Sequence, residues 1–133
     1  MSVAPFVDTN VLLYLLSADA RKAARAEQVL AGRIIVSVQV LNEFANVARR
    51  KAGMAWLPLT QLLADLRQFA DVRPLTLATH EAALALAERY QLAWYDALIA
   101  AAALEAGCHT LLSEDFQDGQ VLQQQLTIRN PFS

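Results

Sequence analysis

The eight residues from Ala97 to Leu104 are all apolar, and this run constrains the fold more than any other segment. It is far shorter than the roughly 20 residues that a helix needs to cross a bilayer. A helix without a charged face is typical of the interior of a protein. We therefore predict a buried helix from about Trp94 to Ala106, ended by Gly107.

The length and composition of the chain favour one domain with a covered sheet. The sequence has 133 residues, of which 56% are hydrophobic, and its mean hydropathy is +0.28. These values suit a sheet that is buried on both faces. We expect a single domain over residues 1–133. The apolar segment Met1–Leu16 has no basic residue before it and contains Asp8, so it does not resemble a secretory signal, and we expect a cytoplasmic protein without a membrane span.

Segments with the patterns of strands and helices alternate along the chain. The predicted strands are Ala4–Val7, Ile34–Val36, Val72–Leu75 and His109–Leu112, with Leu126–Arg129 as a possible fifth. The predicted helices are one after Asp8, then Ala20–Ala31, a helix capped by Ser37 and running to Lys51, Leu59–Ala70, one from Thr76 or Thr79 to Tyr90, and the buried helix. We expect a loop and a short helix over Asp115–Gln124. This alternation predicts a three-layer α/β/α fold around a parallel sheet of four to five strands.

Four acidic residues are predicted to meet at one edge of this sheet. Asp8 directly follows the first strand, and Asp115 comes shortly after the fourth. Asp96 lies in the first turn of the buried helix, and Glu43 lies in the helix that follows the second strand. Because ligands of open parallel sheets bind beyond the carboxyl ends of the strands, we expect these acids to lie close together.

Carboxylates that converge in this way indicate a bound cation. Without one they would repel each other and become protonated. Oxygen ligands without a convergent His or Cys suit Mg²⁺ or Mn²⁺, and the single cysteine, Cys108, excludes a zinc site built from several thiolates. Such ions can activate water and stabilise charge on a phosphate. The net charge of −2 argues against a module that only binds nucleic acid.

Each acid also has an ordinary structural explanation. Asp8 could cap a helix, Asp96 could interact with a helix dipole, Glu43 could be a partly exposed helix residue, and Asp115 could be a loop acid. The functional interpretation depends on their joint placement. Two other acid-dependent α/β classes fit less well, because receiver domains and haloacid-dehalogenase phosphatases need a late lysine, whereas the two lysines here are Lys22 and Lys51.

The order of these motifs resembles the PIN domain and, within it, the VapC-like toxins of bacterial toxin–antitoxin pairs. The resemblance covers essentially the whole chain. It rests on four segments: Val7-Asp8-Thr9-Asn10, Ser37 through Glu43, Tyr95-Asp96-Ala97-Leu98-Ile99-Ala100-Ala101, and Leu112-Ser113-Glu114-Asp115 followed by Phe116-Gln117-Asp118-Gly119.

The resemblance implies a residue set and a function. Asp8, Glu43, Asp96 and Asp115 correspond to the catalytic, metal-binding acids. The supporting polar residues are Thr9, Asn10, Ser113 and Asp118. The implied activity is cleavage of RNA by water activated by Mg²⁺ or Mn²⁺, in a homodimer inhibited by a cognate antitoxin whose tail reaches the acidic pocket. A PIN-type RNA-processing nuclease and a catalytically silent interaction protein are the alternatives.

Overall fold

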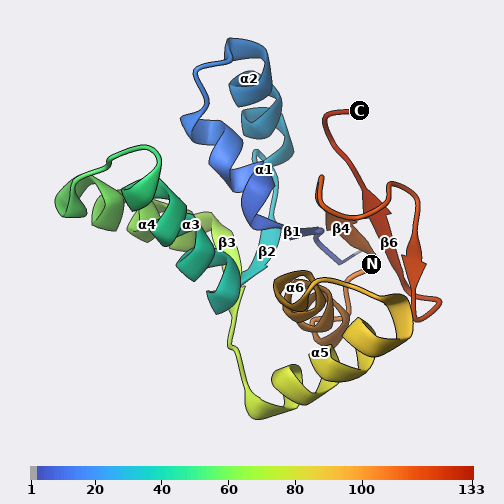
Figure 1. Cartoon of the computed structure of the whole chain (residues 1–133). Coiled ribbons are helices and arrows are strands. Elements are labelled where there is room, and N and C mark those ends of the chain that lie inside the picture. Colours follow the sequence, from blue (N-terminus) through green and yellow to red (C-terminus); the bar gives the residue numbers. More distant parts are fainter. Residues whose placement is uncertain (1–2) are drawn as a thin grey trace.

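A computed structural model describes residues 3–133, and the strands in this range form one sheet (Figure 1). The elements are β1 (Phe6–Val7), α1 (Thr9–Leu13), η1 (Tyr14–Leu16), α2 (Ala20–Val29), β2 (Ile34–Ser37), α3 (Val38–Arg50), α4 (Trp56–Phe69), β3 (Ala70–Arg73), α5 (Leu77–Tyr90), α6 (Trp94–Glu105), β4 (Thr110–Leu112), β5 (Val121–Leu122) and β6 (Leu126–Arg129). Residues 1 and 2 of the predicted domain lie outside the described residues.

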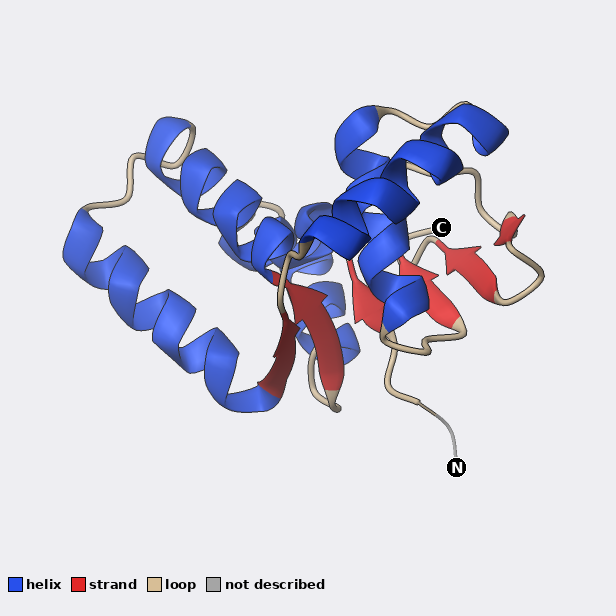
Figure 2. Ribbon diagram, turned by 90° about the horizontal axis from the view of Figure 1, so that it is seen from below, coloured by secondary structure: helices blue, strands red, loops and turns tan. Residues whose placement is uncertain are grey.

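The sheet lies between two layers of helices, as predicted. Helices α1 and α2 lie on one side of it, and α5 and α6 lie on the other (Figure 1). Figure 2 shows α3 and α4 as a pair of helices beside the strands at the β3 end of the sheet. Residues 97–103 of α6 are all buried, which confirms that the apolar run is an interior helix. The buried side chains of the described residues form one continuous core.

The sheet is parallel except at one edge. Its spatial order is β3-β2-β1-β4-β6-β5, and β1 pairs in parallel with both β2 and β4. Strand β5 pairs antiparallel with β6, so the described sheet has six strands instead of the four to five expected.

The prediction of a short helix within Asp115–Gln124 was wrong, because the end of this segment is the edge strand β5. Leu122 and Leu126 are opposite each other in the β5–β6 hairpin, and both are completely buried. Gln123 and Gln124 have φ angles of 55° and 57°, so the chain reverses through left-handed residues. Burial of the two leucines therefore outweighs the helical preference of the glutamines.

Proline positions explain two shifted boundaries. Helix α4 begins at Trp56, before Pro58, because a proline in the first turn removes only an N–H that has no partner within the helix. Strand β3 ends at Arg73, before Pro74, and not at Leu75 as predicted. A proline cannot donate a hydrogen bond to the neighbouring strand.

The topology directs the carboxyl ends of the central strands to one edge of the sheet. Strand β1 ends directly before Asp8, β4 ends directly before Ser113, and β2 ends at Ser37, which caps α3. Helix α3 is therefore anchored at the same edge. Within residues 3–133, no helix has the length and apolar character needed to span a membrane.

Candidate functional site

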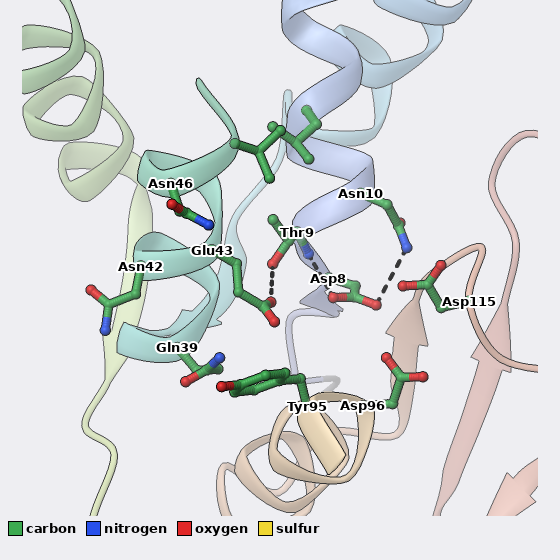
Figure 3. A pocket seen from close by; sticks show the side chains of 12 residues that line it. Asp8, Thr9, Asn10, Gln39, Asn42, Glu43, Asn46, Tyr95, Asp96 and Asp115 are labelled. Carbon is green, nitrogen blue, oxygen red and sulfur yellow. Dashed lines mark hydrogen bonds between the residues drawn. The ribbon is translucent and has the colours of Figure 1, made fainter. Parts of the chain in front are cut away.

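The four predicted acids line one cavity of about 570 Å³ at the carboxyl edge of the sheet. Asp8 comes from the end of β1, Glu43 from α3, Asp96 from the start of α6 and Asp115 from the loop after β4 (Figure 3). Thr9 and Asn10 line the same cavity. The spatial convergence predicted from the sequence is therefore present.

Asp8 is the most deeply buried of these acids, with a 3% exposed surface. It stands between β1 and α1 as the N-cap of the helix, and its Oδ1 accepts a 2.7 Å hydrogen bond from the Thr9 amide. The capping explanation for this residue is therefore correct. Capping does not exclude a functional role, because the cap uses Oδ1, whereas Oδ2 faces other residues.

Ser113 connects Asp8 to the loop that carries Asp115. Its completely buried hydroxyl donates a 2.6 Å hydrogen bond to Asp8 Oδ2 and accepts one of 3.0 Å from the Asp115 amide. Asn10 adds a second connection, because its Nδ2 lies 3.4 Å from Asp8 Oδ2 and its Oδ1 accepts a hydrogen bond from the Glu114 amide at 3.3 Å. These bonds fix the ends of β1 and β4 relative to each other.

Asp8, Asp96 and Asp115 form a compact triad. Each offers one carboxylate oxygen, and these three oxygens lie within 4.8 Å of one another. Asp8 is buried, Asp96 is partly buried and Asp115 is exposed. The triad is therefore enclosed at Asp8 and open to solvent at Asp115.

Glu43 lies outside this triad but on the wall of the same cavity. Its Oε2 accepts a 2.7 Å hydrogen bond from the Thr9 hydroxyl, which joins α3 to the start of α1. Among the hydrogen bonds of residues 3–133, none involves the second oxygen, Oε1. That oxygen is therefore available to a ligand in the cavity.

Burial and neighbouring negative charge disfavour the ionised forms of two of these acids. Burial, with smaller contributions from the charges of Asp115 and Asp96, raises the pKa of Asp8 to about 7 despite the hydrogen bonds from Ser113 and Thr9. Burial also raises the pKa of Asp96 to about 6, with contributions from the charges of Asp115 and Glu43. The hydrogen bonds to Asp8 therefore do not fully compensate for its burial and for the neighbouring negative charges.

A divalent cation fits this donor set. The triad supplies only carboxylate oxygens, which are the ligands preferred by Mg²⁺ and Mn²⁺. A cation among them would favour the ionised forms that burial disfavours. Asp8, Asp96 and Asp115 are the residues that could hold it, with Glu43 beside them.

A known protein family matches most of this chain. The profile of the PIN domain matches residues 6–117, which include all four acids and most of the chain. The chain belongs to the PIN domain family.

Solved structures share the fold of this PIN domain at low sequence identity. VapC20 of Mycobacterium tuberculosis, a sarcin–ricin loop cleaving toxin, is 21% identical with a TM-score of 0.72, over 90% of this chain and 98% of that chain. A toxin–antitoxin complex from Klebsiella pneumoniae is 20% identical with a TM-score of 0.74, over 96% and 98%. FitAcB from Neisseria gonorrhoeae is 18% identical with a TM-score of 0.65, over 96% and 97%. Comparison with curated protein sequences finds no match.

Asp118, predicted as a supporting residue, lies apart from the lining of this cavity. Its Oδ1 accepts a 3.0 Å hydrogen bond from the backbone amide of Asn130, just beyond β6. The structure therefore shows a bond that stabilises the C-terminal loop, and a role for Asp118 at the metal centre stays a prediction.

Several residues of the cavity wall were missed by the sequence analysis. They are Gln39, Asn42, Asn46 and Tyr95. The first three share a helix face with Glu43, at spacings of three and four residues. That periodicity was the signal that could have identified them.

The raised pKa of Asp8 predicts how the stability of the metal-free PIN domain depends on pH. In the unfolded chain Asp8 loses its proton near pH 4, whereas in the folded state it keeps it up to about pH 7. Its contribution to stability is thus fully present below pH 4 and is lost as the pH rises towards 7. We expect Asp8→Asn to raise the free energy of unfolding at pH 8 by on the order of 1–3 kcal/mol, with little gain at pH 4.

Urea unfolding followed by circular dichroism in a chelator measures this difference. The exposed Asp65 of α4 provides the control, because Asp65→Asn makes the same change outside the acidic cavity. An equal gain for Asp8→Asn at pH 4 and pH 8 would contradict a raised pKa.

Proposed function

We propose that this PIN domain is a ribonuclease that hydrolyses RNA phosphodiester bonds with Mg²⁺ or Mn²⁺. The observation that carries the proposal is the triad of Asp8, Asp96 and Asp115, whose oxygens lie within 4.8 Å of one another on the wall of an accessible cavity. A bound divalent ion would supply a nucleophilic water and positive charge for the phosphate. The single predicted domain would carry the whole activity.

The residues of the site have distinct roles in this proposal. Asp8, Asp96 and Asp115 bind the cation, and Ser113 keeps Asp8 and the Asp115 loop in place through its two hydrogen bonds. Glu43 is held by Thr9 through one oxygen, and its other oxygen can contact the cation or accept a hydrogen bond from the attacking water. Asn10 stabilises the loop that carries Asp115, because its Oδ1 accepts a hydrogen bond from the Glu114 amide.

Cleavage of a structured RNA by the purified protein tests the chemistry. We expect products in Mg²⁺ or Mn²⁺, no products with excess chelator, and a rate at least about 100-fold lower for Asp96→Asn, because a ligand of the cation is lost. Gel separation of end-labelled RNA measures the rate.

Asp65→Asn is the matched control, because it removes an exposed carboxylate from α4 outside the cavity lining. It should cleave at the rate of the unaltered protein. Cleavage that persists equally in chelator or in Asp96→Asn would refute the mechanism.

We further propose that this ribonuclease is the toxin of a toxin–antitoxin pair and acts in the cytoplasm. The support comes from its fold relatives, since VapC20 is a sarcin–ricin loop cleaving toxin and the Klebsiella pneumoniae structure is a toxin–antitoxin complex. This chain spans nearly the full length of both relatives. Its partner would be an antitoxin whose tail enters the acidic cavity.

Induced expression tests the toxin role. We expect the unaltered protein to arrest growth, Asp8→Asn not to arrest it, and co-expression of a short DNA-binding protein encoded immediately upstream to restore growth. Colony counts after induction measure the effect. A protein that cleaves RNA in vitro but does not arrest growth would instead be an RNA-processing nuclease.

We also propose that the protein forms a homodimer. The supporting observation is the strong exposure of large apolar side chains on two helices: Trp56 is 66% exposed, Leu57 69% and Leu77 72%. Burial of such side chains favours association. Light scattering after size exclusion should give a mass of about 29 kDa, twice the 14.6 kDa of the chain. A mass that stays at the monomer value at high micromolar concentration would contradict the dimer.

A further inference from the structure

The cavity has two walls of different chemistry. Asp8, Asp96 and Asp115 form one wall, and α3 forms the other with Gln39, Asn42, Glu43 and Asn46. Figure 3 shows Glu43 and Gln39 directed into the cavity, with Asn42 on the outer side of α3. No Lys or Arg is among the residues that line this cavity in the described part of the chain. Apart from Glu43, the polar side chains of the α3 wall are neutral amides, which can both donate and accept hydrogen bonds.

Gln39 is the most enclosed of the three amide side chains on this wall. The residue is only 8% exposed and lines the cavity, yet its amide takes part in no hydrogen bond among residues 3–133. An amide without a hydrogen bond inside the protein can bond to water or to a ligand. No completely enclosed side-chain N or O atom in the described chain lacks a hydrogen-bond partner, so the Gln39 amide must face the space of the cavity.

Tyr95 supplies an aromatic surface beside these amides. It precedes Asp96 in the first turn of α6, is 58% exposed and lines the cavity. Its ring extends from α6 towards Gln39 on α3 (Figure 3). Its neighbour Trp94 instead contacts His80 edge-to-face, with ring centroids 5.3 Å apart, so Tyr95 is the aromatic residue of this turn that is left for a ligand.

We infer that the α3 wall and Tyr95 form a subsite for one unpaired nucleobase of the RNA, next to the phosphodiester that is cleaved. The base stacks on the Tyr95 ring, and the Gln39 amide binds its edge, with Asn42 and Asn46 at the rim. Proteins recognise unpaired RNA bases through this combination of an aromatic face and hydrogen bonds to the base edge. The inference rests on the proposed ribonuclease function and adds to it the selection of a base.

The charge distribution supports this orientation of the substrate. The phosphate needs positive charge, which only the acid wall can acquire by holding a cation. The amides of the α3 wall then face the nucleoside. A cavity of about 570 Å³ lies in the range of pockets that enclose small molecules, so it has room for one nucleotide.

A randomised single-stranded RNA library cleaved in Mn²⁺ tests the base selection. We expect the unaltered protein to prefer one base at a fixed position relative to the cut. Gln39→Leu should keep cleaving but lower that preference by about 5- to 150-fold, because it keeps the bulk of the side chain and removes its hydrogen bonds. Gln61→Leu, on the exposed surface of α4, is the matched control and should leave the preference unchanged.

Binding without cleavage provides a second measurement. In the Asp8→Asn background, fluorescence anisotropy of a labelled short single-stranded RNA should show binding weakened about 5- to 150-fold by Tyr95→Leu and little changed by Tyr95→Phe, which keeps the ring. Thermal unfolding checks that each variant is folded. If Gln39→Leu does not fold, Gln39→Asn takes its place. It keeps the amide on a shorter side chain and should also lower the base preference.

The possible results separate the inference from the function on which it rests. RNA cleavage without base preference, or with a preference that folded Gln39 and Tyr95 variants leave unchanged, would overturn the subsite alone. Variants that keep the preference but escape the antitoxin would make this wall a protein-docking surface and would also overturn it. Absence of both cleavage and RNA binding in the unaltered protein would refute the ribonuclease proposal itself.

Discussion

The hydrogen bond between the Ser113 hydroxyl and the Asp8 carboxylate is the contact on which the acidic site depends. It joins residues 105 positions apart, at the ends of the neighbouring strands β1 and β4, and both partners are buried. The same Ser113 oxygen accepts the Asp115 amide, so one hydroxyl positions two acids. Buried polar groups of this kind are satisfied only when both strands are in register, which couples the geometry of the site to the pairing of the sheet.

The site concentrates negative charge at a cost in stability. The core of the sheet and the apolar helix α6 hold Asp8 and Asp96 in surroundings that raise the pKa of both carboxyls. Acids scattered over the surface would destabilise the ligand-free protein less. Their oxygens, however, would not converge on a cation. Folded proteins commonly accept such local destabilisation at sites that must bind a ligand.

The cavity combines the aspartate triad with the amides of α3, and the two come from different elements of the fold. Asp96 and Tyr95 are adjacent in sequence at the start of α6, yet one belongs to the acidic triad and the other lies beside the amides of α3. Thr9 links the walls through its bond to Glu43. Chemistry at a phosphate and recognition of a base can therefore be placed within one pocket of a small PIN domain.

The sequence by itself determined the layered α/β class, the buried helix and the four acids, because strand and helix periodicities and the residues after each strand are local properties. It did not determine strand β5, whose formation depends on Leu122 reaching the core opposite Leu126. Nor did it distinguish the triad from Glu43, or bring Gln39 and Tyr95 into the pocket. Only the tertiary structure decided these, because they depend on how separate helices are oriented across the edge of the sheet, and no short segment of the chain specifies that orientation.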